Sequence, residues 1–339
     1  MKRRTFLKRT LAASAGLALS GARSLHGELF DGKIITVTGP ISPADAGIFL
    51  PHEHVMSKFG DEITDDPQYD SEVLDRRVRP YLEYIHGLGG GTLADCTTRY
   101  FGRNVEVLRE LSINSGLQIL SNTGYYGAAN DRYIPEHAYR ESAEQVAQRW
   151  INEWTHGIQG TGIRPGFIKI GVDEGALSDI DAKLVRAAAQ THRQTGLVMA
   201  VHTGDSMESV TQQLRILAEE GVHPSAWIWV HAQNTKRVEG LVFAAKQGAW
   251  IELDGVSEKN AQPHLEVVQQ LKQLGYLNNL LLSHDGNSYR AGTRPPKGYD
   301  ALFTTFIPLL QTSGFSSEEI YQLTQANPAK AFTVAVRSV

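Results

Sequence analysis

Four histidines and one aspartate stand at the ends of β-like runs in this chain of 339 residues. His52 and His54 are two residues apart, so strand alternation turns both toward one face and Glu53 toward the other. A neutral imidazole offers one lone pair and is the commonest metal ligand. One buried histidine is usually a core residue, but four at the ends of three runs favour a metal site. Imidazole and carboxylate suit zinc, iron, manganese or cobalt alike. The candidate ligands are His52, His54, His202, His231 and Asp285.

A lysine inside an apolar run is the sixth candidate. In the run 166–172, alternation places Ile168 and Ile170 on the face that packs under helices, and Lys169 on the opposite face, which would point into a barrel. A buried ammonium must find a partner or lose its charge, because desolvation costs several kcal/mol. A neutral amine reacts with carbon dioxide, and the resulting carbamate can bridge two metal ions. The alternative is an ion pair with an acid such as Asp285, and the residues alone leave both open.

The elements that position these residues alternate between short apolar runs and helical stretches. Eight runs in this pattern predict βαβ units closed into a distorted (β/α)₈ barrel, whose site lies at the C-terminal strand ends. A doubly wound open sheet is the alternative, but no Gly-x-Gly-x-x-Gly follows the first run. The runs are 47–55, 91–97, 117–126, 166–172, 197–203, 226–230, 249–254 and 280–285, with helical stretches including 182–194, 207–220, 238–247, 264–274 and 318–325. A short β extension at 33–38, with a turn at Gly39-Pro40, precedes them.

Residues 1–25 have the pattern of an export signal. A basic start is followed by an apolar run with small residues near Ala22, and the pair Arg3-Arg4 before Phe6, Leu7 and Lys8 resembles a twin-arginine leader. A basic amphipathic N-terminal helix is the alternative. The apolar run is shorter than the ~20 residues of a membrane span. We therefore expect export to the periplasm, or secretion, with no stable membrane insertion afterwards, and a single barrel domain over 26–339.

The composition is that of an ordinary globular protein, with 41% hydrophobic and 21% charged residues. Cys96 is the only cysteine, which excludes an intramolecular disulfide. Through Ser24 the leader holds six cations and no acid, so its removal takes the formal net charge from −4 to −10. Nucleic acid rewards clustered Lys and Arg, so a mature protein of this sign is a poor partner for it. We expect a small-molecule substrate and no nucleic acid.

Five motifs resemble the phosphotriesterase family of the amidohydrolase superfamily. They keep their order over about nine-tenths of the chain. The motifs are Asp31-Gly-Lys-Ile-Ile-Thr-Val-Thr-Gly-Pro-Ile-Ser-Pro-Ala-Asp-Ala-Gly-Ile-Phe-Leu-Pro-His-Glu-His54, Gly162-Ile-Arg-Pro-Gly-Phe-Ile-Lys169, Val201-His202-Thr203, Ser283-His284-Asp285 and Asn327-Pro328-Ala329-Lys330.

The resemblance implies a hydrolase of ester bonds (class EC 3.1) with two divalent metal ions, zinc being the expected element. The first run's two histidines and Asp285 would hold one ion, and His202 and His231 the other. Carboxylated Lys169 would bridge the two ions together with a hydroxide that attacks an ester, lactone or phosphotriester. Asp285 would also act as the base. A homodimer is a further expectation from the family.

Several positions depart from the family pattern or extend it. Asn234 stands where members carry a relay aspartate, and an amide cannot accept a proton as a carboxylate does. Gly255 stands where lactonase-like members have arginine and triesterase-like members histidine. Tyr126 falls where family members place an aromatic wall of the leaving-group or lactone pocket, with ordinary packing as the alternative. Arg290 and Arg294, after the eighth run, are candidates to grip an anionic or carbonyl group, with a solvated loop as the alternative.

Two other functions fit the same residues. One is an exported barrel that binds a ligand without turnover, since intact ligands beside an altered relay are compatible with that. The other is an amidohydrolase that uses the same metals on an amide bond. His284, which precedes Asp285 with the opposite alternation, is expected to pack outside the barrel interior.

Overall fold

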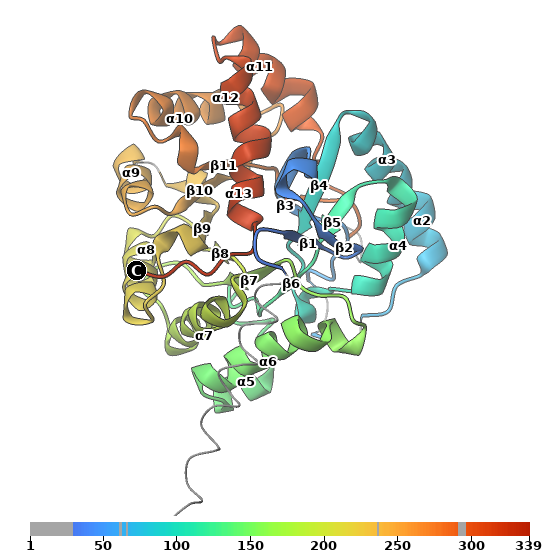
Figure 1. The fold of residues 1–339 in the computed structure, drawn as a ribbon, viewed down its shortest axis with the longest axis vertical. Helices are drawn as coiled ribbons and strands as arrows, with labels where there is room; N and C mark the ends of the chain where they lie inside the picture. Colours follow the sequence, from blue (N-terminus) through green and yellow to red (C-terminus); the bar gives the residue numbers. More distant parts are fainter. Residues whose placement is uncertain (1–29, 61–62, 66, 236, 291–295) are drawn as a thin grey trace, which may run out of the picture.

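The computed structural model describes residues 30–60, 63–65, 67–235, 237–290 and 296–339; the predicted leader lies outside them. Parallel strands surrounded by helices form the predicted (β/α)₈ barrel (Figure 1). Eight strand positions make up its wall, two of them interrupted. In order they are β3 (Ile48–His54), β4 (Gly90–Asp95), β5 (Gln118–Leu120) with β6 (Asn122–Thr123), β7 (Phe167–Gly171), β8 (Met199–His202), β9 (Trp227–Val230), β10 (Trp250–Leu253), and β11 (Leu280–Leu282) with β12 (Gly286–Asn287).

The barrel wall consists of two parallel sheets joined by the chain itself. One has the order β11-β10-β9-β8-β7-β6 and the other β12-β3-β4-β5. They meet where the third strand breaks at Ser121 and the eighth breaks after Leu282. Across the second break the amide of Asp285 donates to the carbonyl of His52 at 3.1 Å. This sequential order around a closed wall excludes the doubly wound alternative. The predicted third run, 117–126, was too long, because the strand ends at Thr123.

Apolar side chains fill the barrel interior at the end where the strands begin. Phe49 and Phe167, near the starts of their strands, pack on Phe332 with ring centroids 4.9 and 5.2 Å apart. Phe332 ends helix α13 (Asn327–Phe332), so this helix closes the N-terminal end of the barrel. Cys96 is buried in the same cluster. The polar residues are thereby confined to the other end, where the strands finish.

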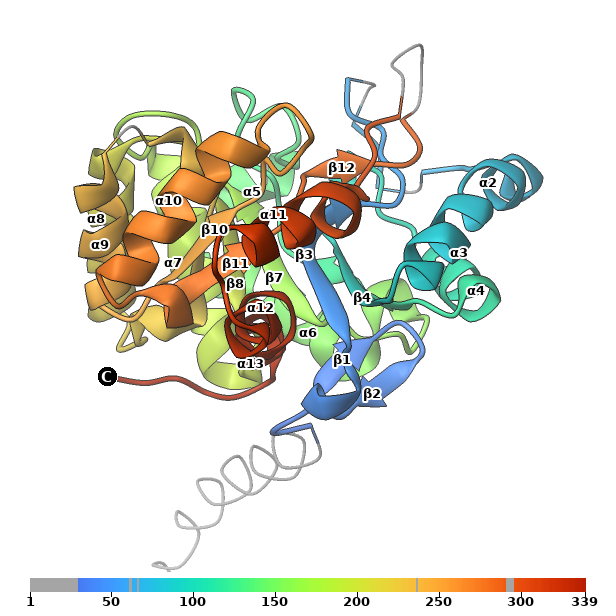
Figure 2. The same cartoon turned by 90° about the horizontal axis from the view of Figure 1, so that it is seen from above.

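Helices cover the outside of the strands, α2–α4 on one side and α7–α10 on the other (Figures 1 and 2). Helix α7 shows why they form: Ser178 and Asp181 make a capping box at its start, and Gly196 ends it in the left-handed conformation. The predicted stretch 318–325 divides into α12 (Ser317–Tyr321) and a π-turn. None of the described helices is long and apolar enough to cross a membrane. The others are α2 (Ser71–Arg77), α3 (Arg79–Gly87), α4 (Val105–Ser115), α5 (Glu136–Arg140), α6 (Ala143–His156), α7 (Asp179–Thr195), α8 (Met207–Glu219), α9 (Val238–Lys246), α10 (Ala261–Gln273) and α11 (Ile307–Thr312).

The first and last described segments are bound to each other. Strands β1 (Ile34–Thr36) and β2 (Gly39–Ile41) form the expected N-terminal extension, an antiparallel hairpin. The predicted turn at Gly39-Pro40 was wrong: both residues pair in β2, and Val37-Thr38 form the turn. Val334 in the C-terminal tail accepts from the amide of Gly32 and donates to the carbonyl of Lys33. Val334 therefore ties the C-terminal tail to the first described residues.

Candidate metal centre

The two histidines at the end of β3 lie beside Asp285. The Nε2 atoms of His52 and His54 are 3.5 and 3.3 Å from Oδ1 of Asp285. Bonds of about 2.0–2.2 Å to one ion bring ligand atoms to about this separation. Burial opposes ionisation of Asp285, but the hydrogen bond from His54 and the charge of His52 hold its pKa well below its usual range. This trio offers an anionic ligand and two imidazoles to one ion.

A second pair of imidazoles adjoins the first. The rings of His202 and His231 meet edge to face with centroids 4.3 Å apart, and His231 is 5.1 Å from the ring of His52. Burial, and then the charges of His231 and Lys169, hold the pKa of His202 well below its ordinary value. His202 is therefore neutral and keeps a lone pair for a ligand. Its Nδ1 is hydrogen-bonded to Oη of Tyr126 at 3.1 Å, which places that tyrosine at the centre.

Two of the six residues lie beyond the strand ends in the left-handed region. His231 has φ 64° and Asp285 has φ 51°, a conformation that costs a non-glycine residue about 1–3 kcal/mol. Long-range hydrogen bonds hold them there: the His231 amide donates to Oδ2 of Asp254, and the Asp285 amide to the carbonyl of His52. The eighth run was predicted to continue to Asp285, but β11 ends at Leu282 and the backbone turns.

Asp254 orients histidines of both groups, and we did not predict it. Its carboxylate is fully buried, and it accepts from Nδ1 of His52 and Nδ1 of His231, each at 2.7 Å. Burial opposes its charge, but the charge of His231 and these hydrogen bonds hold its pKa well below the usual range. Because Asp254 accepts from Nδ1 of both rings, it turns Nε2 of each ring toward the metal position, where that nitrogen serves as a ligand once it has lost its proton. The sequence signal that could have indicated Asp254 is strand alternation, which places it on the same face as Trp250 and Glu252.

Lys169 is buried without the ion pair that was the alternative to carboxylation. Its side chain on β7 is 1% exposed, and Nζ has no hydrogen-bond partner and no carboxylate within 4.0 Å among the described residues. Asp285 instead contacts the histidines. Glu252, also buried, has two carboxylate oxygens without a hydrogen bond, one of them 3.4 Å from Nδ1 of His52. An orphaned amine inside a ring of metal-ligand residues fits a group that carboxylation would complete.

The phosphotriesterase family's sequence profile matches residues 32–332, nearly all of the described chain. The chain belongs to the phosphotriesterase family.

This phosphotriesterase-family protein is similar to proteins with different named activities. A phosphotriesterase homology protein from Escherichia coli (strain K12) is 30% identical, the match covering 84% of this chain and 98% of the relative. An N-acetyltaurine hydrolase from Tetraodon nigroviridis is 28% identical over 89% of this chain and 98% of the relative. The solved organophosphorus hydrolase from Deinococcus radiodurans is 28% identical, with a TM-score of 0.81 and coverage of 89% of this chain and 97% of that one.

The departures from the family pattern have clear structural outcomes. Asn234 is exposed, and its side chain makes none of the hydrogen bonds described for the centre. Its neighbour Gln233 turns inward and bonds Asp254 instead, which the sequence did not indicate. Arg290 lies with its guanidinium 5.9 Å from the ring of Phe59, and its predicted substrate contact stays a prediction. Arg294 lies outside the described residues.

A polar cavity of about 410 Å³ opens beside His202. The segment Ala128–Asn130 and the two acids Asp173 and Glu174 contribute to its lining. The paired carboxylates give it a negative potential. Of the candidate ligands, His202 lines this cavity.

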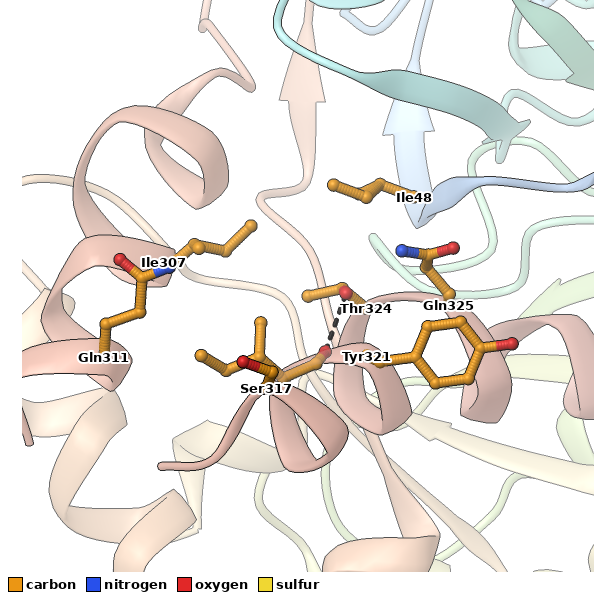
Figure 3. Close-up of a pocket in the computed structure, with 8 residues that line it drawn as sticks. Ile48, Ile307, Gln311, Ser317, Tyr321, Thr324 and Gln325 are labelled. Carbon is orange, nitrogen blue, oxygen red and sulfur yellow. Dashed lines mark hydrogen bonds between the residues drawn. The ribbon is translucent and has the colours of Figure 1, made fainter. Parts of the chain in front are cut away.

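A different cleft, of about 190 Å³, lies at the other end of the barrel (Figure 3). Ile48, the first residue of β3, lines it together with Ile307, Gln311, Tyr321 and Thr324. The candidate ligands are at the last residues of β3 and its neighbours. This cleft is consequently separate from the centre.

The carboxylate of Glu53 holds the loop that presents Asp285. Glu53 is fully buried outside the barrel interior, as strand alternation predicts. It accepts from the amide and Nδ1 of His284, from the amide of Gly286 and from Oγ of Ser283, at 2.6–3.1 Å. His284 itself accepts from the amide of Leu302, so it packs outward as expected. The two residues on either side of Asp285 are thereby tied to β3.

Replacing Glu53 by Gln should destabilise the protein by about 3 kcal/mol, because an amide presents donors to buried N–H groups that need an acceptor. The free energy of unfolding is measured by urea titration followed by circular dichroism. The exposed Glu110 on α4 offers the matched control, and Glu110→Gln should stay within about 0.5 kcal/mol of wild type. Equal urea midpoints for Glu53→Gln and wild type would contradict the anchoring role.

Proposed function

We propose that this phosphotriesterase-family protein is a hydrolase with two divalent metal ions, zinc being the expected element, that acts on ester, lactone or phosphotriester bonds. The observation that carries the proposal is the convergence of two ligand groups around one orphaned, buried lysine. His52, His54 and Asp285 would hold one ion, and His202 and His231 the other. Carboxylated Lys169 would supply the anionic bridge. When bound, paired cations lower the pKa of water and polarise the oxygen of the scissile bond.

Asp285 has a second role in this proposal. Oδ1 faces the Nε2 atoms of His52 and His54, and Oδ2 lies 3.8 Å from Nζ of Lys297. The side chain is 36% exposed, so part of the carboxylate is accessible from solvent. Its depressed pKa keeps it ionised at neutral pH. Asp285 can thus accept the proton released when water attacks the substrate.

The cavity beside His202 favours neutral or cationic substrates. Asp173 and Glu174 would repel a free carboxylate, sulfonate or phosphomonoester. Lactones, aryl esters and phosphotriesters carry no such charge. Substrate binding on this side therefore agrees with the ester reading.

Amide hydrolysis is the second candidate function. Its support is the likeness to an N-acetyltaurine hydrolase, which matches nearly the whole chain. The same ligands and base could serve an amide, so a substrate panel separates the two. N-Acetyltaurine carries a sulfonate, and the acidic cavity disfavours it relative to neutral amides.

The decisive experiment combines metal analysis with the variant Asp285→Asn. Wild type should contain about two metal ions per chain and lose hydrolysis on chelation. Loss of the base should lower kcat by about 10²- to 10⁴-fold on a panel of lactones, aryl esters, phosphotriesters and neutral amides. A pure protein that holds no metal, and that gains no activity from metal with bicarbonate, would end the proposal. Ligand binding by wild type with no turnover of any substrate would favour a binding protein.

Carboxylation of Lys169 has its own test. Wild type loaded with metal and ¹³C-bicarbonate should show a carbamate signal by NMR. Lys169→Gln should lose both that signal and most of its metal, because the bridging anion is gone. The exposed Lys246 provides the control, since Lys246→Gln keeps an identical centre. Retention of metal by Lys169→Gln would exclude the bridge.

We further propose that residues 1–25 direct twin-arginine export to the periplasm. The support is the pair Arg3-Arg4 before an apolar run. Fractionation of a Gram-negative host should place the processed protein in the periplasm. The double variant Arg3→Lys/Arg4→Lys should keep it unprocessed in the cytoplasm. Unprocessed wild type in the cytoplasm would rule out this destination.

A further inference from the structure

Gln233 makes a two-point contact with Asp254. Its Nε2 donates to Oδ1 of the carboxylate at 2.7 Å, and its Oε1 accepts from the amide of Asp254 at 3.2 Å. Gln233 lies in a short 3₁₀ turn, 232–234, directly after His231. A single side chain therefore fixes both the backbone and the carboxylate of Asp254.

The carboxylate so fixed is shared between the two ligand groups. Oδ2 accepts from Nδ1 of His52 and from the amide of His231, and Oδ1 accepts from Nδ1 of His231 and from Gln233. Each oxygen thus receives two donors, which is its usual capacity. If the Gln233 donor were missing, Oδ1 would be left with the His231 ring alone. The carboxylate could then rotate, and both imidazoles would lose their fixed direction.

The space that Gln233 occupies exists because residue 255 has no side chain. A Cβ at Gly255 would lie 3.2 Å from Nε2 of Gln233 and 3.0–3.1 Å from the ring of His264. These separations are tighter than ordinary van der Waals contact, so a side chain there would press on both. His264 is 6% exposed, and its Nδ1 donates to the carbonyl of Asn260 at 2.8 Å. Gly255, which has no side chain, and the ring of His264 on α10 therefore leave the space in which the Gln233 side chain lies.

We infer that Gln233 is a positioning residue that clamps Asp254 and thereby fixes the rings of His52 and His231, one from each ligand group. The inference rests on the proposed function in taking these rings as metal ligands. The amide does not titrate, so the clamp holds without supplying or removing a proton. Gln233 acts through Asp254 and touches neither substrate nor metal.

The variant Gln233→Leu tests the clamp, since leucine fills similar space without donor or acceptor. Metal affinity, measured by competition with a chromophoric chelator, should fall about 10- to 100-fold. With metal in excess, kcat should fall while KM stays near wild type. Asn234→Leu is the matched control, because Asn234 is exposed in the same turn and should leave metal affinity and kcat unchanged. Thermal unfolding of both variants checks that each is folded.

A second measurement needs no metal. In the metal-free protein, at a pH high enough to leave both imidazoles neutral, ¹⁵N NMR should show His52 and His231 protonated on Nδ1 alone, and Gln233→Leu should mix the tautomers. Gln233→Glu keeps the size but adds a carboxylate beside Asp254, so it should also weaken metal binding. Wild-type tautomers and wild-type metal affinity in Gln233→Leu would overturn the inference. Absence of metal from wild type would defeat the proposed function alone, because the tautomer result still decides the role of Gln233.

Discussion

Two buried carboxylates, Asp254 and Glu53, collect enough hydrogen-bond donors to offset their lost hydration, and the centre is arranged around them. Asp254 gathers its donors inside the barrel, and Glu53 gathers its donors outside. The first fixes rings from separate strands, and the second fixes the loop carrying Asp285. Each carboxylate is satisfied only when distant segments are in register. Correct closure of the wall and correct placement of the ligands are therefore one event.

The fold and most of the site could be predicted from residue patterns. Apolar runs alternating with helices fix the barrel, and the spacing of His52 and His54 fixes their common face, because both depend on local geometry. The orientations of His231 and Asp285 could not be predicted, since their left-handed backbone depends on hydrogen bonds from distant strands. That Gln233 and not Asn234 points inward could not be predicted either. Both lie in one short turn, which has no repeating pattern of apolar and polar residues to show which side chain faces the centre.

The family likeness and the residues around the centre bear on different parts of the proposed function. The ligand groups and Lys169 agree with the phosphotriesterase family, whose profile spans the barrel. Around the ligand groups lie a glycine at 255, Gln233 bonded to Asp254, and acids beside His202. Barrel enzymes vary chemistry through the loops after the strands, and these features lie there. We expect these features, rather than the proposed ligand groups, to set the substrate class.

The bond between the hairpin and the C-terminal tail bears on synthesis. Val334 joins Gly32 and Lys33 across almost the whole sequence, so the barrel floor stays open until translation is finished. Contacts of such separation form late, because loop closure must first be compensated by other structure. A nascent chain would expose Phe49 and Phe167 until Phe332 covers them. Truncation of the last dozen residues would consequently leave an apolar opening at the base, a hazard for aggregation rather than for the chemistry above it.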